Sequence, residues 1–320
     1  DFAGLGSDFD LVILNSTIQY FPDERYLRSV LSHALEACAP GGSVFIGDVR
    51  NSWLQAALHL DVLRSRHEEA APSRIPEREA VLARIEREPE LLVAPQYFWS
   101  LSRELNVGAL SVTPAPGEFE NEFTRYRYDV LMSAGKAARA VTHVRRCERA
   151  AELDDALDGL ERESYDAVMF SSARRDAVFE RAQAAMRLFG RPAEGQRDAQ
   201  QSVFATARAR AGILADASWI LCNEFGDGDV VMRRSSDERY SHVELYDNET
   251  VSRSAPARSI VEPKETMRRQ EAVRAIRAQL SKAIAKPLMP NAIHVVESIP
   301  AKGATYVDFT AMLPSRRASP

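Results

Sequence analysis

The sequence has few cysteines and no long apolar run, and both shortages narrow the possible classes of protein. Only three cysteines, Cys38, Cys147 and Cys222, occur in 320 residues. They are too few and too far apart for a disulfide framework or a cysteine-based zinc site, so we expect no metal and a reducing, cytoplasmic compartment. No apolar run is long enough to cross a bilayer, and no signal peptide is visible, which predicts no membrane partner.

An excess of basic charge is also lacking. The chain has 41 lysines and arginines against 46 aspartates and glutamates, a formal net charge of −5, and its arginines are interspersed with glutamates. This composition argues against a nucleic-acid partner. No glycine-rich loop follows a strand, and no acidic residue ends a second strand in the way that a ribose-binding residue does. We interpret Gly4-Leu5-Gly6, which precedes a strand, as a connecting turn.

Residues 9–51 predict a strand, a helix, a turn and a second strand. Residues 11–14 form an apolar run typical of a parallel strand that is buried on both faces. Apolar positions then recur at helical spacing up to residue 39, Pro40-Gly41-Gly42 ends the helix, and residues 44–47 form another buried strand. Parallel strands joined by a helix bind ligands beyond their carboxyl ends. There we expect Asn15, Ser16, Gln19, Tyr20, Asp48 and Arg50 to gather, with Arg50 paired to Asp48.

Four ordered motifs, LNSTIQYFP, PGGSVFIGDVRN, ELLVAPQYF and NEFTRYRYDVL, resemble a known family. They are similar to the methyltransferase domains embedded in the adenylation domains of nonribosomal peptide synthetases, from residue 1 to about 132. The resemblance implies an α/β fold, a partial Rossmann-like sheet that lacks its first strands. It places the last two strands at residues 107–114 and 125–132, with the final one antiparallel, and leaves residues 11–14 with one unpaired edge.

The resemblance also implies a cofactor, a partner and a set of site residues. S-adenosylmethionine (SAM) would donate the methyl group, and the acceptor would be an aminoacyl substrate on the phosphopantetheine of a peptidyl carrier protein, beside neighbouring synthetase domains. Expected catalytic or substrate-orienting residues are Asp48, Asn121, Glu122 and Tyr126. Expected cofactor-binding residues are Asp1 and Phe2 at the adenine, with Asn15, Ser16, Gln19 and Tyr20. Positioning of this kind needs neither a nucleophile nor a metal.

Several of these residues have a plainer interpretation beside the functional one. Asn121 and Glu122 either orient the substrate amine through paired acceptors or form a solvated loop. Tyr20 either lines the pocket or only leads into a helix, and Tyr126 is open between the two roles. His59, a single histidine among leucines, predicts a packed side chain more than a base.

The chain changes character after residue 133. We predict the methyltransferase part at residues 1–133, a small α/β subdomain at 134–260, and an adenylation-domain remnant at 261–320. The last segment begins with an amphipathic helix over residues 264–286. Its resemblance to the closing piece of an adenylation domain places Tyr306 where the family has a catalytic lysine. A tyrosine cannot supply that cation, so we expect adenylation to be impaired.

The leading hypothesis is a synthetase fragment that methylates the amino group of a carrier-bound aminoacyl substrate. Two alternatives stay open: a non-catalytic insert that positions neighbouring domains, and an epimerase-like insert derived from a methyltransferase. Because the glycine-rich loop is missing, we expect this chain alone to bind SAM weakly or not at all.

Overall fold

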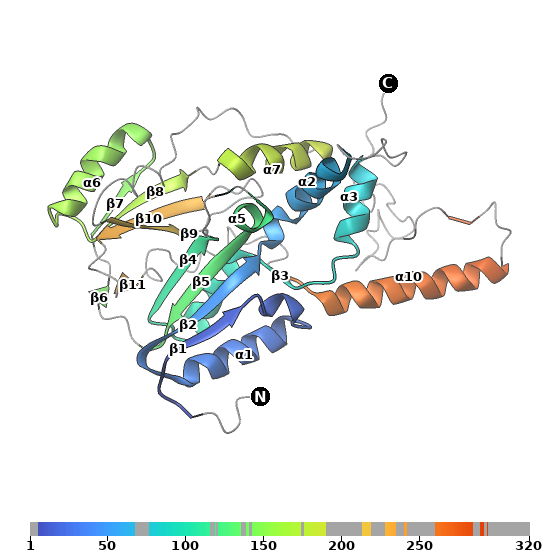
Figure 1. Cartoon of the computed structure of the whole chain (residues 1–320), viewed down its shortest axis with the longest axis horizontal. Coiled ribbons are helices and arrows are strands. Elements are labelled where there is room, and N and C mark those ends of the chain that lie inside the picture. Colours follow the sequence, from blue (N-terminus) through green and yellow to red (C-terminus); the bar gives the residue numbers. More distant parts are fainter. Residues whose placement is uncertain are drawn as a thin grey trace, which may run out of the picture.

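The structure is a computed structural model of the whole chain, shown in Figure 1. It describes residues 6–67, 77–115, 119, 121–135, 139–140, 143–173, 176–189, 213–218, 228–234, 240–241, 260–283, 289–290 and 293. The predicted adenine-binding residues Asp1 and Phe2, and Tyr306 at the expected lysine position, lie outside these residues. In the part of the chain that is described, no helix is both long enough and apolar enough to cross a membrane.

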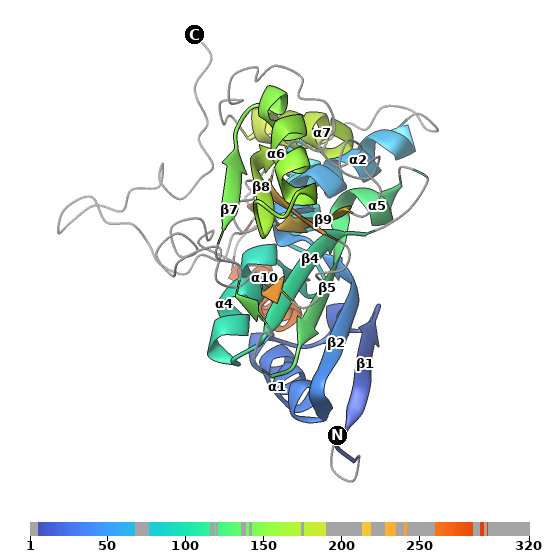
Figure 2. The same cartoon turned by 90° about the vertical axis from the view of Figure 1, so that its left-hand side faces the viewer.

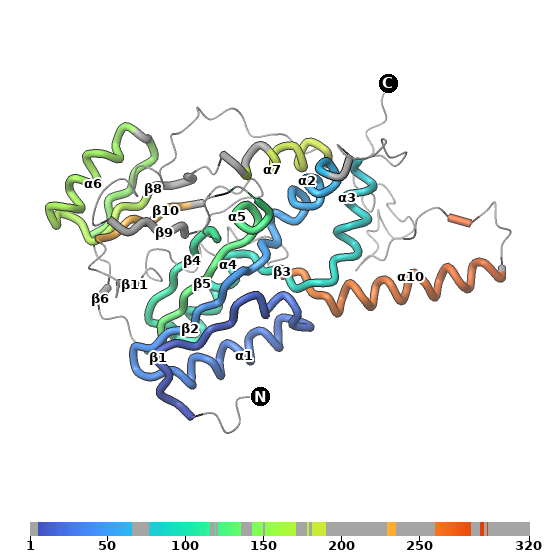
Figure 3. The backbone as a smooth tube through the Cα atoms, viewed as in Figure 1, coloured from blue at the N-terminus to red at the C-terminus, as the bar shows by residue number. Residues whose placement is uncertain are grey.

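A four-stranded mixed sheet forms the first part of the fold. Its spatial order is β1 (Phe9–Asn15), β2 (Cys38–Arg50), β5 (Arg127–Ser133) and β4 (Ala109–Pro114). β1 and β2 are parallel and are joined through η1 (Ile18–Tyr20) and α1 (Glu24–Glu36), a path that Figure 3 traces. β5 runs antiparallel to both of its neighbours, β2 and β4.

The predicted strand pairing is confirmed. Val12 is opposite Val44 in the parallel pair, and Ile46 is opposite Val130 in the antiparallel pair. Among the described residues, no strand pairs with the outer edge of β1. The fold is therefore α/β and compatible with a partial Rossmann-like sheet. One boundary differs, because a one-turn helix, α5 (Glu122–Tyr126), precedes β5, which starts at Arg127 and not at residue 125.

The core lies on one face of this sheet. Val44, Ile46, Val130 and Met132 share that face and are fully buried against α1 and α4 (Pro95–Glu104). The helix α1 presents Leu27, Leu31 and Ala34 to them, and it begins at Asp23, whose side chain accepts a hydrogen bond from Tyr26 N at 2.9 Å. On the opposite face, Leu11 is 50% exposed and Ile13 is 59% exposed.

Helices and a separate two-stranded sheet follow the carboxyl end of β2. The chain continues through η2 (Ser52–Leu54), α2 (Gln55–His67) and α3 (Glu77–Ile85) to the short strand β3 (Leu92–Val93). β3 pairs antiparallel with β12 (Ile260–Val261), which leads into α10 (Pro263–Ala283). The helix predicted there is confirmed, but Met267 and Ile276, which were expected on its apolar side, are 60% and 40% exposed. Figure 1 shows α10 extending away from the sheet.

A second four-stranded sheet follows in the chain. Its order is β7 (Val144–Cys147), β8 (Ala167–Ala173), β10 (Gly228–Arg234) and β9 (Ile213–Ser218). η3 (Ala150–Glu152) and α6 (Leu153–Glu161) connect β7 to β8, and α6 covers this sheet (Figure 2). After β8, α7 (Asp176–Leu188) packs against α2. A separate parallel pair joins β6 (Arg139–Ala140) to β11 (Tyr240–Ser241).

The hydrophobic core continues across residue 133. Ala167, Met169 and Val231 of the second sheet belong to the same buried cluster as Val130 of the first sheet. Another cluster combines Leu54 and Leu58 near α2 with Val178 and Ala182 of α7. The first sheet and the segment after residue 133 are therefore packed together through shared apolar side chains.

Asp61 on α2 is a polar hub inside this packing. Its Oδ2 accepts a hydrogen bond from the Tyr126 hydroxyl at 2.8 Å and lies 3.4 Å from Arg125 Nη1. Arg181 Nε of α7 lies 3.1 Å from both carboxylate oxygens. One carboxylate thus joins α2, α5 and α7.

We predict that Asp61→Ala destabilises the fold by roughly 2 kcal/mol, because the buried phenol and two partly buried guanidinium groups lose a shared acceptor. Urea unfolding of the full chain measures this loss. Asp10→Ala, which removes an exposed carboxylate from β1, is the matched control and should change the free energy of unfolding by less than about 0.5 kcal/mol. Equal effects of the two substitutions would contradict the role of Asp61 as a hub.

Candidate functional site

Two residues at the carboxyl ends of β1 and β2 have left-handed backbone conformations. Ser16, directly after β1, has φ of 50°, and Asp48, near the end of β2, has φ of 66°. Residues other than glycine rarely adopt such angles, which cost of order 1 kcal/mol or more and concentrate at functional sites. The two residues are neighbours: Ser16 Oγ donates a hydrogen bond to Asp48 Oδ2 at 2.8 Å. The sheet therefore holds a strained polar pair at its carboxyl edge.

The strain at Asp48 comes from a β-bulge. The register between β2 and β5 shifts between Ile46 and Val49, so Asp48 has no partner residue in the ladder. Its backbone N–H instead donates to Asp129 Oδ1 on β5, at 2.9 Å. Burial of Asp129, together with the nearby Asp48 charge, raises the pKa of the Asp129 carboxyl against the lowering effect of that hydrogen bond. The bulge turns the Asp48 side chain toward Ser16 and the start of β5.

Arg127 connects Asp48 to Glu122. Its Nη1 donates to Asp48 Oδ2 at 2.8 Å, and its Nη2 donates to Glu122 Oε1 at 3.0 Å. The guanidinium also stacks over the Phe123 ring, with its central carbon 4.3 Å from the ring centroid. Only 13% of the Arg127 side chain is exposed, against 44% of Glu122. Ser16, Asp48, Arg127 and Glu122 therefore form one connected group, which we call the strand-end cluster.

Asn121 holds Glu122 in this position through the helix that follows it. Asn121 Oδ1 accepts from Thr124 N at 3.1 Å, and the Asn121 backbone N–H donates to Thr124 Oγ1 at 3.0 Å. This reciprocal capping box starts α5 at Glu122. The Asn121 side chain is thus engaged with the backbone, and its neighbour Glu122 is the group that faces Arg127.

The residues expected at the cofactor side are split between surface and interior. Asn15 and Ser16 are exposed, and Tyr20 is 73% exposed. Gln19 is buried, its backbone oxygen accepts from Leu91 N at 2.8 Å, and its Oε1 has no hydrogen-bond partner among the described residues. Asn15 lies against Gly47, where a Cβ atom would come within 2.1 Å of Asn15 Oδ1. Because Gly47 has no side chain, the Asn15 side chain can pack against the backbone there.

A second, buried ionic cluster lies beyond the end of β2, and we call it the Glu88 cluster. Arg50 Nη1 lies 2.8 Å from Glu88 Oε1 and 2.7 Å from Glu90 Oε2, and His59 Nε2 lies 3.3 Å from Glu88 Oε2. The prediction that Arg50 pairs with Asp48 is therefore wrong. Arg127 binds Asp48, and Glu88 and Glu90 bind Arg50. His59 is buried here, as expected of a packed side chain.

The electrostatics of the Glu88 cluster favour the ionised carboxylate. Burial raises the pKa of the Glu88 carboxyl, but the hydrogen bond from His59 and the Arg50 charge outweigh it and lower the pKa to about 2. Only 2% of the Glu88 side chain is exposed, so the charge depends on these two partners. The cluster stabilises the turn that leads from α3 to β3.

The structure brings together some predicted site residues and separates others. Asp48, Ser16 and Glu122 meet in the strand-end cluster, and Asn15 and Asn121 adjoin it. Tyr126 is only 3% exposed, and its hydroxyl donates to Asp61 at 2.8 Å. It therefore lies in the packing of α2 and α7, outside the strand-end cluster.

Arg127 and Glu88 are the important residues that sequence reasoning did not assign to a site. Arg127 alternates with Tyr126 and Tyr128, which indicated a polar face of a strand but not a partner. The signal that identifies its role is the antiparallel register, which sets Arg127 opposite Arg50, with only the Val49–Tyr128 pair before the bulge at Asp48. Glu88 lies in a charged stretch that has no periodic pattern, so only the fold reveals its burial.

Comparisons with known proteins find peptide synthetases. The chain is 38% identical over 147 residues to chondramide synthase cmdD of Chondromyces crocatus, which is 44% of this chain and 4% of that protein. It is 38% identical over 129 residues to the probable non-canonical nonribosomal peptide synthetase CymA of Salinispora arenicola, 40% of this chain and 2% of that protein. With peramine synthetase ppzA of Metarhizium rileyi it shares 34% identity over 142 residues, 41% of this chain and 5% of that protein.

About two fifths of the chain is therefore homologous to nonribosomal peptide synthetases, and the chain spans only a few per cent of the length of these relatives. No protein-family model matches the chain.

Gly47→Ala is expected to displace the Asn15 side chain and to lower stability by about 1 kcal/mol, because the new methyl group also comes within 2.8 Å of the Phe45 ring. The Asn15 side-chain amide signal in NMR spectra and a thermal melt report the two effects. Gly6→Ala is the control, since nothing lies within 4 Å of a Cβ there. An unshifted Asn15 signal would show that Asn15 does not lie over Gly47.

The Glu88 cluster predicts acid sensitivity. Because the folded-state pKa of Glu88 is about 2, below that of an unfolded glutamate, its stabilisation is complete above about pH 4.5 and is lost as pH falls toward 2. The loss amounts to roughly 3 kcal/mol at most. Denaturant unfolding between pH 6 and pH 2.5 should show a smaller decline for Glu88→Gln than for the unchanged protein. Glu79→Gln, at an exposed site on α3, should leave the slope unchanged.

Proposed function

We propose that this chain is part of a peptide synthetase and transfers a methyl group from SAM to the amino group of a carrier-bound aminoacyl substrate. The observation that carries the proposal is the strand-end cluster, in which two strained residues and two acids meet at the carboxyl edge of parallel strands. Ligands of open α/β sheets bind at this edge. The homology to peptide synthetases supports the same assignment and makes the carrier protein and neighbouring synthetase domains the proposed partners.

The residues around the cluster fit one side of a SAM molecule. Asn15, Ser16 and Tyr20 are exposed beyond the end of β1 and offer amide, hydroxyl and aromatic groups to a nucleoside. Gln19 is buried below this surface, so its side chain supports the site from the interior. When bound, SAM supplies a methyl group on a sulfonium, an activated leaving group that needs no metal or protein nucleophile.

The acids of the strand-end cluster are suited to orienting an amine. Glu122 is partly exposed, and its Oε1 is held by Arg127, so its carboxylate has a fixed direction. Asp48 Oδ2 accepts from both Ser16 and Arg127, which fixes this carboxylate beside the first. Hydrogen bonds from the substrate N–H groups to these carboxylates would aim the nitrogen lone pair at the methyl carbon, and the same oxygens can take the proton that the amine releases.

Arg127 lies between the two acids and fixes both carboxylates in place, with Nη1 on Asp48 and Nη2 on Glu122. Asn121 and Tyr126 act indirectly, through the helix that carries Glu122. Asn121 caps the start of that helix, and Tyr126 anchors its end to Asp61. We assign both as positioning residues.

Asp48→Asn and Glu122→Gln in the synthetase that contains this chain should lower kcat for methyl transfer by about tenfold or more, because each substitution removes a charged acceptor from the amine. The assay follows methyl transfer to a carrier loaded with an amino acid, and circular dichroism checks the fold. Glu36→Gln, on the exposed side of α1, is the control. Full activity in both variants, with an intact fold, would show that the strand-end cluster is not the methylation site and would favour a spacer role.

A further inference from the structure

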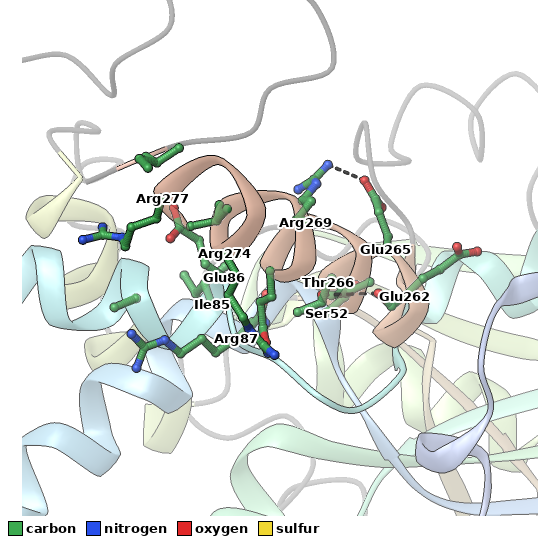
Figure 4. Close-up of a pocket in the computed structure, with 16 residues that line it drawn as sticks. Ser52, Ile85, Glu86, Arg87, Glu262, Glu265, Thr266, Arg269, Arg274 and Arg277 are labelled. Atoms are coloured by element: carbon green, nitrogen blue, oxygen red, sulfur yellow. Dashed lines mark hydrogen bonds and ion pairs between the residues drawn. The ribbon is translucent and has the colours of Figure 1, made fainter. Parts of the chain in front are cut away.

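A large pocket lies apart from the strand-end cluster, between α10 and the end of α3. Its volume is about 810 Å³, which is in the range of sites for small organic ligands and far above the space that one ion needs (Figure 4). The inner wall contains Ser52 and Gln55 at the start of α2, and the floor includes the apolar side chains of Ile85, Val261 and Val273. The pocket therefore combines an apolar floor with a polar rim.

Arginine side chains are concentrated on that rim. The helix α10 has six lysines and arginines and two glutamates, although the whole chain has a net charge of −5. Arg269, Arg274 and Arg277 of α10 line the pocket together with Arg87, which follows α3. Four guanidinium groups from two segments thus surround one space.

The acids of the pocket are in part committed elsewhere. Glu265 forms an ion pair with Arg269, which Figure 4 shows directed away from Arg87. Glu262 Oε1 accepts a hydrogen bond from the backbone of Glu24 at 3.1 Å. Glu86 is the third lining acid, and Arg274 Nη2 donates to Gln270 Oε1 at 3.4 Å. The lining therefore has four arginines against three acids, an excess of one positive charge.

Arginine clusters of this kind are suited to phosphate. A guanidinium stays charged at every physiological pH and binds two phosphate oxygens at once, and several guanidiniums can share the oxygens of one phosphate. An inorganic ion alone would leave the apolar floor empty. A phosphate ester on an uncharged, flexible chain uses both parts of the pocket.

The position of the pocket connects it to the strand-end cluster. Ser52 and Gln55 lie two and five residues after the end of β2, the strand that contains Asp48. Gln55 Nε2 also donates to Glu88 Oε2 at 3.5 Å, so the pocket wall is built on the Glu88 cluster. The pocket and the strand-end cluster therefore both use β2 or the segment that follows it.

We infer that the pocket between α3 and α10 binds the phosphate and the adjoining aliphatic part of a phosphopantetheine-type arm. The inference rests on the proposed function in one respect, because that function supplies the carrier-bound arm as the ligand. The phosphate recognition itself depends only on Arg87, Arg274 and Arg277.

The test measures binding of pantetheine 4′-phosphate to the full chain by calorimetry, without SAM or a methylation step. The double substitution Arg274→Gln and Arg277→Gln should weaken binding at least tenfold, and Arg87→Gln should weaken it further. Arg268→Gln is the matched control, because it removes the same charge from α10 at an exposed residue that does not line the pocket. Pantetheine without phosphate should bind at least tenfold more weakly than the ester.

Three results would overturn the inference. The first is no binding of the ester, or equal binding by the double variant and by Arg268→Gln. The second is equal affinity for inorganic phosphate and for the ester, which would leave the apolar floor without a role. The third is tighter binding of ATP than of the ester, lost in the double variant, which would assign the arginines to a nucleotide. Since no result depends on methyl transfer, failure of the proposed function and failure of this inference can be told apart.

Discussion

The antiparallel insertion of β5 between β2 and β4 is the constraint on which the rest of the structure depends. β5 provides Val130 and Met132 to the core, and it also brings Arg127 to the carboxyl end of β2. A guanidinium at a half-buried position needs acceptors, since an unpaired buried cation costs several kcal/mol. The bulge at Asp48 and the one-turn helix at Glu122 supply them. The strand-end cluster is thus a consequence of how β5 enters the sheet.

Two neighbouring arginines at this sheet edge are kept apart by different acids. Arg50 and Arg127 are opposite each other in the β2–β5 ladder, where like charges repel. Arg50 turns to Glu88 and Glu90, whereas Arg127 turns to Asp48 and Glu122. Each cation therefore binds its own pair of acids. One group supports the turn before β3 and the wall of the pocket, and the other forms the polar surface at the strand ends.

The Asp61 hub extends this arrangement into the second half of the chain. It ties Tyr126, at the end of the helix that begins with Glu122, to Arg181 on α7. The position of Glu122 therefore depends on packing with a helix more than fifty residues further along the chain, as the separation of positions 122 and 181 shows. The continuous core around Met169, Val231 and Val130 gives the same coupling in apolar form.

The sequence by itself determined the β1–α1–β2 crossover and the meeting of Ser16 with Asp48, and the resemblance to a known family added the antiparallel β5. The crossover follows from local signals, namely apolar runs, helical spacing and polar residues at strand ends. The end of the helix does not follow from them, because α1 stops at Glu36 and Pro40-Gly41-Gly42 lies inside β2. Only the tertiary structure decided which charges pair. Arg50 was expected beside Asp48, but Arg127 took that place, because ion-pair partners depend on strand register and on a bulge that no periodic pattern reveals. The burial of Glu88 and of Tyr126, and the pocket that α10 forms with α3, likewise arise from contacts between distant segments, so their geometry exists only once the chain has folded.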